Sequence, residues 1–260
     1  MRLALGLEYD GAAFSGWQTQ AGGNTVQDAL ERALREFAGA ELPTICAGRT
    51  DAGVHATYQV VHIDTDLDRP LHNWVRGVNS FLPRSVAVRW CVVVPEAFHA
   101  RYGAQARRYD YWLLNDPVRR PLTEQRIGWV FRPLDEVRMR AAAACLRGTH
   151  DFSAFRAAEC QAASPVRTVH ELGIARRGAF LQVRITANAF LHHMVRNIVG
   201  ALVEVGVARQ APAWIAEVLA GRDRSRAAPT FAASGLYLSG VQYDAAFGLP
   251  APLDGTPLPE

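Results

Sequence analysis

The sequence contains no lysine, so all 28 residues counted as lysine plus arginine are arginines. Schiff-base catalysis, pyridoxal-phosphate anchoring and the Walker A phosphate loop each need a lysine amine, and these three kinds of chemistry are therefore excluded. Codon usage in a G+C-rich genome explains such a bias without any function. Even so, every one of these side chains ends in a planar guanidinium, whose N–H donors match the geometry of a phosphate group.

Cysteine is scarce as well. The four cysteines have no CxxC spacing and lie mostly in apolar runs. This favours small buried side chains in a reducing compartment over a disulfide framework or a zinc site. No apolar run approaches the roughly 18 residues that cross a membrane, and glycine-rich dinucleotide, HExxH and GxSxG motifs are missing. We expect a cytoplasmic protein with no bound metal and no membrane partner.

The charge is small in total but uneven along the chain. The formal net charge is +3, whereas residues 101–132 hold seven arginines against three acidic residues. This distribution favours a basic face and permits a polyanionic partner. With 260 residues, of which 49% are hydrophobic, the chain can form one large domain or two fused modules.

Hydrophobic periodicity predicts the order β-α-β-β-α-β in the first hundred residues. The predicted elements are a strand at 3–9, a helix at 26–37 capped by Asn24 or Thr25 and ended by Gly39, strands at 42–47 and 58–63, a helix at 71–78 and a strand at 86–94. This order is typical of a split βαβ, ferredoxin-like unit.

The second half repeats the order of elements without visible sequence similarity. Its predicted elements are a strand at 109–113, a helix at 135–147, paired strands at 166–175 and 180–187, helices at 191–207 and 213–220, and a strand at 236–241. We interpret the chain as an α+β protein of two fused ferredoxin-like halves with antiparallel sheets, divided into domains at 1–100 and 101–260. We expect the functional site in a cleft between the halves.

The most unusual window is Gly-Arg-Thr-Asp-Ala-Gly-Val-His at 48–55. Gly48 and Gly53 bracket the carboxylate of Asp51 in a predicted loop between two strands. The glycines let the backbone turn sharply and leave few neighbouring side chains to crowd a substrate. An aspartate that only caps a turn explains the same pattern, and the pattern alone does not decide between the two.

A second window, at 104–111, places cations beside aromatic rings. Arg107 and Arg108 precede Tyr109 and Tyr111 in a predicted strand. Aromatic rings beside arginines suit unpaired bases and their phosphates. An edge strand with half-buried tyrosines and solvated arginines fits the pattern equally, and without further observations it is the simpler interpretation.

A third window, at 188–197, opens the predicted helix at 191–207. Adjacent helical residues point about 100° apart, so His192 and His193 are not expected to bind one metal ion together. Arg196 precedes apolar helix positions and is expected to be partly buried. A buried arginine normally needs an acidic partner, and we expect that partner from elsewhere in the fold.

Four motifs together resemble the tRNA pseudouridine synthase A family. They are GRTDAGVH at 48–55, RRYDY at 107–111, HHMVRN at 192–197 and GLYL at 235–238. The resemblance extends from Leu5 to Tyr243. It implies an isomerase that converts uridine to pseudouridine at positions 38, 39 and 40 of the anticodon stem-loop of tRNA. It also implies a homodimer that needs no cofactor.

The same resemblance implies roles for individual residues. Asp51 takes the place of the essential aspartate, whose step stays open between attack on the sugar, attack on the base and deprotonation at the sugar 2′ position. Tyr109 stacks on the uracil and removes the C5 proton, and Arg196 pairs with Asp51. Arg49 holds the target nucleotide out of its stack, and Leu236 forms an apolar wall. From the basic face we add Arg107 and Arg108 as phosphate contacts.

Two other functions stay open at this point. A non-catalytic RNA-binding module on the same halves would be basic and aromatic but would not need Asp51. A carboxylate-dependent hydrolase of a small nucleoside would need a second acid near Asp51 and no basic face.

Overall fold

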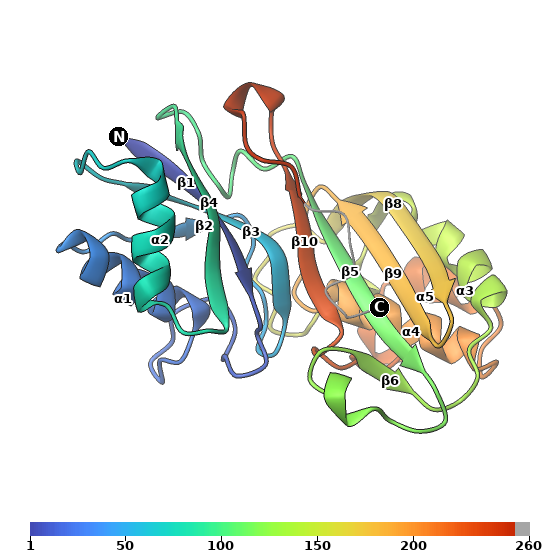
Figure 1. The fold of residues 1–260 in the computed structure, drawn as a ribbon. Coiled ribbons are helices and arrows are strands. Elements are labelled where there is room, and N and C mark those ends of the chain that lie inside the picture. Colours follow the sequence, from blue (N-terminus) through green and yellow to red (C-terminus); the bar gives the residue numbers. More distant parts are fainter. Residues whose placement is uncertain (253–260) are drawn as a thin grey trace. The chain divides into compact units, whose positions relative to one another are not determined.

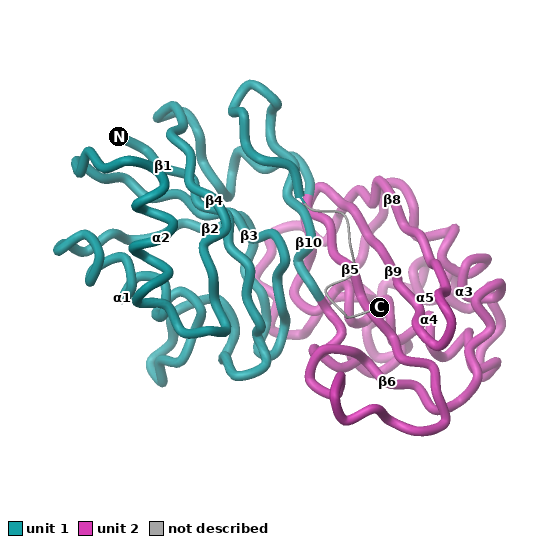
Figure 2. The backbone as a smooth tube through the Cα atoms, viewed as in Figure 1, with its two compact units in different colours: residues 1–106, 237–260 teal, residues 107–236 magenta. Residues whose placement is uncertain are grey.

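The structure, a computed structural model, describes residues 1–252. Within them the chain forms two compact units (Figure 2). Unit 1 contains residues 1–106 and the segment from Tyr237 onward, and unit 2 contains residues 107–236. The predicted domains, 1–100 and 101–260, have one boundary, whereas the two units have two boundaries, because the last strand returns to unit 1. The predicted domain assignment stays a prediction, and residues 253–260 of its second part lie outside the described residues.

Unit 1 is a sheet with two helices (Figure 1). Its elements are β1 (Arg2–Tyr9), α1 (Val26–Ala38), β2 (Ile45–Cys46), β3 (His55–Asp64), α2 (Leu71–Phe81), β4 (Val86–Val94) and β10 (Leu236–Gln242). The strand β1 pairs antiparallel with both β3 and β4, and β10 pairs parallel with β3. The predicted strand at 42–47 is too long, because only β2 pairs with β3.

The helix α1 begins and ends where its sequence signals predict. The side chain of Thr25 accepts a hydrogen bond from the Asp28 N–H, and the Asp28 carboxylate accepts one from the Thr25 N–H. This reciprocal pair satisfies amide groups that a helix start leaves open. Gly39 ends the helix with a φ of 75°, a left-handed conformation that favours glycine.

Close packing joins α1 to α2. A Cβ atom at Gly77 of α2 would lie 2.2 Å from the ring of Phe37 in α1. The ring in turn packs against Trp74 of α2, with centroids 5.1 Å apart. A larger residue at position 77 would therefore force the Phe37 ring away from its place between the two helices.

Unit 2 consists of mostly antiparallel strands and helices. Its elements are β5 (Ala106–Asn115), β6 (Gly128–Val130), α3 (Glu136–Ala143), β7 (Gly148–Asp151), β8 (Val166–Arg177), β9 (Phe180–Ala187), α4 (Met194–Gly206) and α5 (Trp214–Gly221). Antiparallel pairing gives the strand order β5-β9-β8-β7, and β6 pairs parallel with β5. The predicted α+β class is confirmed, and the strand pairing is mostly antiparallel.

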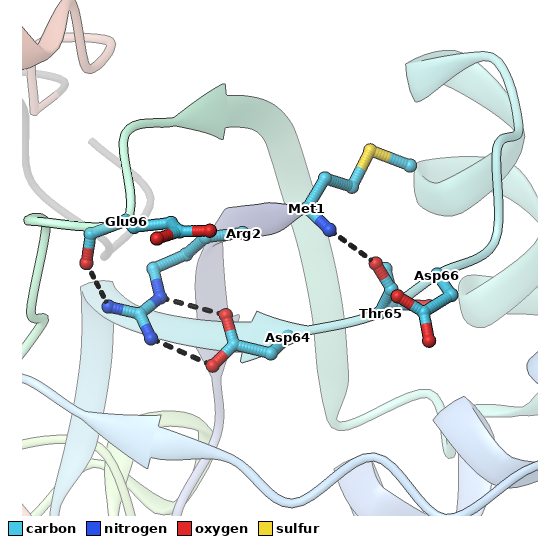
Figure 3. A pocket seen from close by; sticks show the side chains of 6 residues that line it. All are labelled: Met1, Arg2, Asp64, Thr65, Asp66 and Glu96. Carbon is cyan, nitrogen blue, oxygen red and sulfur yellow. Dashed lines mark hydrogen bonds and ion pairs between the residues drawn. The ribbon is translucent and has the colours of Figure 1, made fainter.

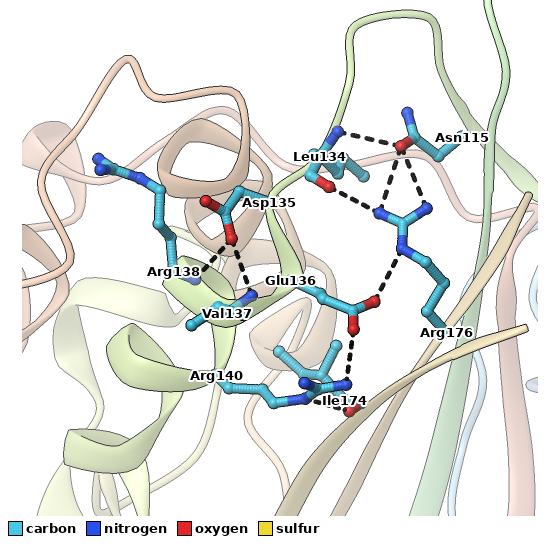
Figure 4. A network of polar contacts seen from close by, with 9 residues as sticks. All are labelled: Asn115, Leu134, Asp135, Glu136, Val137, Arg138, Arg140, Ile174 and Arg176. Carbon is cyan, nitrogen blue, oxygen red and sulfur yellow. Dashed lines mark hydrogen bonds and ion pairs between the residues drawn. The ribbon is translucent and has the colours of Figure 1, made fainter.

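An arginine network ties α3 to the sheet of unit 2 (Figure 4). Arg176 of β8 donates from Nε to Glu136 at 2.8 Å and from Nη2 to the carbonyl oxygen of Leu134 at 2.6 Å. Arg140 of α3 donates to the carbonyl oxygen of Ile174 at 2.9 Å. The start of α3 is thus fixed over β8 by charge-assisted hydrogen bonds.

Several elements of unit 2 differ from the predictions. The short strands β6 and β7 were not predicted, and the helix predicted at 191–207 is α4, which begins only at Met194. His193 stands before it with a φ of 60°, which interrupts a helical backbone. No helix within residues 1–252 combines the length and apolarity needed to cross a membrane.

Candidate active site

The loop that carries Asp51 joins β2 to β3 and is anchored on both sides. Before it, the carbonyl oxygen of Gly48 accepts a hydrogen bond from Nε2 of the buried Gln59 at 2.6 Å. Beside it, the hydroxyl of the buried Thr50 lies 2.8 Å from the hydroxyl of Tyr9. These side chains belong to β3 and β1, so the sheet itself fixes the position of the loop.

Backbone contacts hold the same loop from its other side. The carbonyl oxygen of Thr50 accepts a hydrogen bond from the Trp17 N–H at 2.9 Å. A Cβ atom at Gly16 would lie 2.8 Å from that oxygen, and Gly16 has a φ of 96°. The loop and the segment before α1 therefore approach as closely as two backbones can, which only a glycine allows.

The turn closes directly after Asp51. Its carbonyl oxygen accepts a hydrogen bond from the Val54 N–H at 3.1 Å, and Gly53 has a φ of 76°. Thr50 and Val54 are buried, whereas the side chain of Asp51 is partly exposed. The loop thus presents a carboxylate on a fixed backbone at the surface of unit 1, and Gly53 makes the sharp turn that its place in the motif predicts.

His55, the last residue of this motif, stabilises the start of β3. It is 2% exposed, and its Nδ1 accepts a hydrogen bond from the Gly11 N–H at 3.0 Å. Its ring stacks on that of Tyr237 in β10, with centroids 4.7 Å apart. Asp10 lies 3.1 Å from the same nitrogen. His55 therefore links the start of β3 to the segment after β1 and to β10, next to the Asp51 loop, a role that the motif did not indicate.

A thiolate nucleophile is not available beside this loop. Cys46 is buried, and its burial raises the pKa of the thiol to about 12. At neutral pH the side chain is a neutral thiol, which is a poor nucleophile and a poor metal ligand. The carboxylate of Asp51 is the group suited to chemistry here. Arg49, two residues before it, is exposed.

Tyr109 lies in unit 2, in the middle of β5. Tyr109 is 8% exposed, and its ring contacts the ring of Phe190 edge to face, with centroids 5.0 Å apart. The register places Tyr109 opposite Ile185 of β9. Phe190 lies in the 188–197 window but was given no role from sequence, since nothing local indicates that it packs against β5.

Arg196 lies in the first turn of α4 and is partly buried, as predicted. Its Nε donates a hydrogen bond to the carbonyl oxygen of Phe231 at 2.8 Å, and its own carbonyl oxygen accepts one from the Phe231 N–H at 3.3 Å. A guanidinium is planar, so the bond at Nε also sets the plane of the two Nη groups. Phe231 is a partner that the sequence did not reveal.

The argument made for the two histidines is wrong. His192 and His193 precede α4, and their ring centroids lie 4.0 Å apart with 36° between the planes. They therefore do not diverge as adjacent residues of a helix would. The expectation that no metal binds here stays a prediction. The helical geometry on which it was based does not apply, because both histidines precede α4.

The remaining predicted residues lie on the two strands β5 and β10. Arg107 and Arg108 follow each other on β5, and both are partly exposed. Nη1 of Arg107 donates to the carbonyl oxygen of Asn188 at 3.0 Å. Leu236 begins β10 and is 5% exposed.

Unit 2 therefore brings part of the predicted site together. The segment 188–196 contacts β5 twice, through Asn188 on Arg107 and through Phe190 on Tyr109. Asp51 belongs to unit 1, whereas Arg196 belongs to unit 2. Their ion pair stays a prediction, as does the expected cleft between the halves.

A hollow of about 410 Å³ lies elsewhere on unit 1 (Figure 3). It is lined by Met1, Arg2, Asp64, Thr65, Asp66 and Glu96. Arg2 contacts both carboxylate oxygens of Asp64, at 2.7 and 2.8 Å, and lowers the pKa of that carboxyl. The lining includes none of the predicted site residues, and its central charges neutralise each other.

Comparison with known proteins supplies a family for these motifs. A family model described as tRNA pseudouridine synthase matches residues 7–103 and 142–244. The tRNA pseudouridine synthase A of Burkholderia multivorans is 60% identical over 250 residues, which cover 96% of this chain and 93% of that protein. The protein of the same description from Herminiimonas arsenicoxydans is 58% identical over 253 residues, covering 96% and 92%. The ranges matched by the family model contain Asp51 and Arg196, whereas Tyr109 lies between them.

Proposed function

Because the chain belongs to the tRNA pseudouridine synthase family, we propose that it converts uridine to pseudouridine at positions 38, 39 and 40 of the anticodon stem-loop of tRNA. In this isomerisation the N1–C1′ bond breaks, the uracil turns, and a C5–C1′ bond forms. C5 loses a proton and N1 gains one, so no oxidant, reductant or group donor enters the balance. The side chains of the protein can carry such a reaction by themselves.

A target inside a stem must leave its base stack before a carboxylate can reach it. Extrusion of one nucleotide costs a few kcal/mol, which stacking and phosphate contacts offset. We assign Arg49 to holding the extruded nucleotide, Tyr109 to stacking on the uracil and Leu236 to the apolar wall beside it. Arg107 and Arg108 contact phosphates of the stem.

Asp51 is the essential acid of the proposed reaction. The observation that carries this assignment is the loop itself, in which the buried Thr50 is held by Tyr9 and by Trp17 while the Asp51 side chain stays accessible. A catalytic group gains from such fixed placement, because the entropy of positioning is lost on folding rather than during the reaction. Arg196 pairs with Asp51 and keeps it ionised, and Tyr109 removes the C5 proton late in the reaction.

The test is Asp51→Asn, which keeps the shape of the side chain and removes its charge. Uridine carries a hydrogen at C5 that pseudouridine lacks, so release of tritium from tRNA labelled at uridine C5 measures turnover directly. We expect turnover to fall at least about a hundredfold, with unchanged thermal unfolding and tRNA binding. Asp68→Asn, an exposed acid beyond β3, is the matched control. Turnover of the Asp51 variant within about tenfold of the unmodified protein would refute the assignment.

The chain also acts, in this proposal, as a homodimer in the cytoplasm. Unit 2 exposes four large apolar side chains between β5 and α3, namely Val118, Leu122, Trp129 and Phe131. Their exposed fractions run from 42% to 96%, and the rings of Trp129 and Phe131 lie next to each other with centroids 6.2 Å apart, so we assign this segment to the dimer interface. Leu122→Asp should shift sedimentation equilibrium toward monomer, whereas Val137→Asp, at an exposed position of α3, should not.

A further inference from the structure

Arg224 makes three hydrogen bonds inside unit 2 that the proposed chemistry does not use. It lies in a short 3₁₀ helix, Arg224–Arg226, after α5. Nη1 donates to the carbonyl oxygen of Ala228 at 2.9 Å, and Nη2 donates to Asn197 Oδ1 and to Thr230 Oγ1, both at 3.1 Å. One guanidinium thus joins α4 to the segment 228–231.

Asn197 is the centre of this network and directly follows Arg196 in α4. Its side chain is fully buried, and its Oδ1 accepts a second hydrogen bond, from Thr230 Oγ1 at 2.7 Å. Its Nδ2 donates to the carbonyl oxygen of Phe155 at 2.8 Å. A buried amide with these partners has little freedom to move, because each lost hydrogen bond leaves a polar group unsatisfied.

The segment 228–231 is therefore fixed against α4, and it holds Arg196. A Cβ atom at Gly200 of α4 would lie 2.5 Å from the carbonyl oxygen of Pro229, so the segment lies directly on the helix. Two residues further on, the carbonyl oxygen of Phe231 accepts the hydrogen bond from Arg196 Nε. The position of that oxygen decides in which direction the Nη groups of Arg196 point.

We propose that Arg224, acting through Asn197 and Thr230, is the positioning residue for Arg196. This inference rests on the role assigned to Arg196 in the proposed function. Arg224 holds the segment 228–231 on α4, the segment presents the Phe231 carbonyl oxygen, and that oxygen orients the Arg196 guanidinium toward a carboxylate. Displacement of a catalytic contact by about 1 Å can cost two orders of magnitude in rate. Loss of Arg224 should therefore lower kcat much more than it changes KM for tRNA.

The test compares Arg224→Ala with Arg226→Ala, an exposed arginine of the same short helix. Tritium release at saturating tRNA gives kcat, and its concentration dependence gives KM. We expect kcat of Arg224→Ala to fall about tenfold or more with KM within about twofold, and both constants of Arg226→Ala to stay near those of the unmodified protein. Equal kcat in the two variants would overturn the proposal.

Substitutions at Thr230 keep the test valid if Arg224→Ala folds poorly. Thr230→Val removes the hydroxyl at nearly constant volume, whereas Thr230→Ser keeps it, so kcat should fall in the first variant and be restored in the second. Val218→Ala, at a buried position of α5, serves as a control for instability alone. If kcat of Thr230→Val falls no further than that of a Val218→Ala protein of equal thermal stability, the role of the network is structural and the proposal fails.

A spectroscopic readout separates this inference from the proposed function. The Nε–H of Arg196 gives an NMR signal that Arg196→Lys removes, which identifies it, and its hydrogen bond to Phe231 slows exchange with water. We expect this exchange to accelerate in Arg224→Ala and not in Arg226→Ala. Full activity of Arg196→Lys would refute the catalytic role of Arg196. An inactive Arg196→Lys with an unchanged Nε–H signal in Arg224→Ala would refute only the positioning role of Arg224.

Discussion

The guanidinium of Arg184 binds both carboxylate oxygens of Asp110 across the β5–β9 pair, at 2.7 and 3.1 Å. The Asp110 residue is 3% exposed and immediately follows Tyr109. Such a two-pronged contact compensates the cost of burying a carboxylate and fixes the register of the two strands. The strand that carries Tyr109 thus depends on an ion pair on its neighbouring residue.

Removing one partner of this pair should destabilise the protein more than removing both. Arg184→Met leaves a buried carboxylate without its cation, and we expect the free energy of unfolding to fall by about 2 kcal/mol, since Arg184 is itself partly solvated. The double variant with Asp110→Leu should recover most of that loss. Urea unfolding followed by circular dichroism measures both, with Arg177→Met on the exposed end of β8 as control. A double variant as unstable as the single one would contradict this account.

Replacements of Tyr109 should separate stacking from proton transfer. Tyr109→Phe keeps the ring that meets Phe190 edge to face, so tRNA affinity should persist while turnover falls about a hundredfold or more. Tyr109→Leu should weaken both, because the aromatic face is lost. Filter binding and tritium release give the two quantities. Equal turnover of Tyr109→Phe and the unmodified protein would limit the tyrosine to a stacking role.

Salt dependence should report the phosphate contacts of β5. Each phosphate neutralised contributes about −0.9 to the slope of log affinity against log salt on duplex DNA, and we expect a similar value for an RNA stem. Arg107→Ala and Arg108→Ala should each flatten the slope by about one contact. Arg209→Ala, whose guanidinium pairs with Glu204 at 3.0 Å, is the control and should leave it unchanged. An affinity that does not change with salt would rule out the basic face.

We also expect turnover to persist in EDTA. Loss of turnover in EDTA that zinc restores would reveal a metal requirement.

Acid should destabilise unit 1 through His62. Burial, followed by electrostatic interaction with Arg2 and His99, lowers the pKa of His62 to about 4, and its Nδ1 accepts a hydrogen bond from the Ala100 N–H at 3.2 Å. An unfolded chain takes up a proton at this histidine near pH 6.5. Between about pH 6.5 and pH 4 the unfolded state therefore binds more protons, so stability is complete above this range and is lost as the pH falls through it, by up to about 3 kcal/mol.

The variant His62→Asn tests this dependence, because an asparagine oxygen can replace Nδ1 as acceptor but does not titrate. Its free energy of unfolding should change less between pH 7 and pH 4 than that of the unmodified protein. His72→Asn, at an exposed position of α2, should change nothing. An unaltered pH profile in His62→Asn would assign the acid sensitivity to other groups.

The order of elements and the Asp51 loop were predictable because their signals are local. Alternation of apolar residues predicted β1, and a run of β-branched residues predicted β4. Thr25 and Gly39 marked the ends of α1 through hydrogen bonds to residues within four positions. Gly53 has the positive φ that its place in the loop motif suggested. In each case the determining atoms lie within a few residues along the chain.

Elements and contacts that depend on distant residues were decided only by the tertiary structure. The strands β6 and β7 have three and four residues, too few for a periodic pattern, and exist because β5 and β8 supply their hydrogen bonds. The start of α4 is shifted by the left-handed backbone of His193, a conformation that no neighbouring residue type demands.

The surroundings of the candidate catalytic residues show the same division. Sequence motifs selected Asp51 and Arg196 as residue types at particular places, but the partner of Arg196 Nε is Phe231, 35 residues further along the chain. Side-chain type and local spacing determine which groups are available. Only the packing of segments far apart in sequence determines where their hydrogen-bond donors point, because a donor can take any acceptor that the fold brings within about 3 Å.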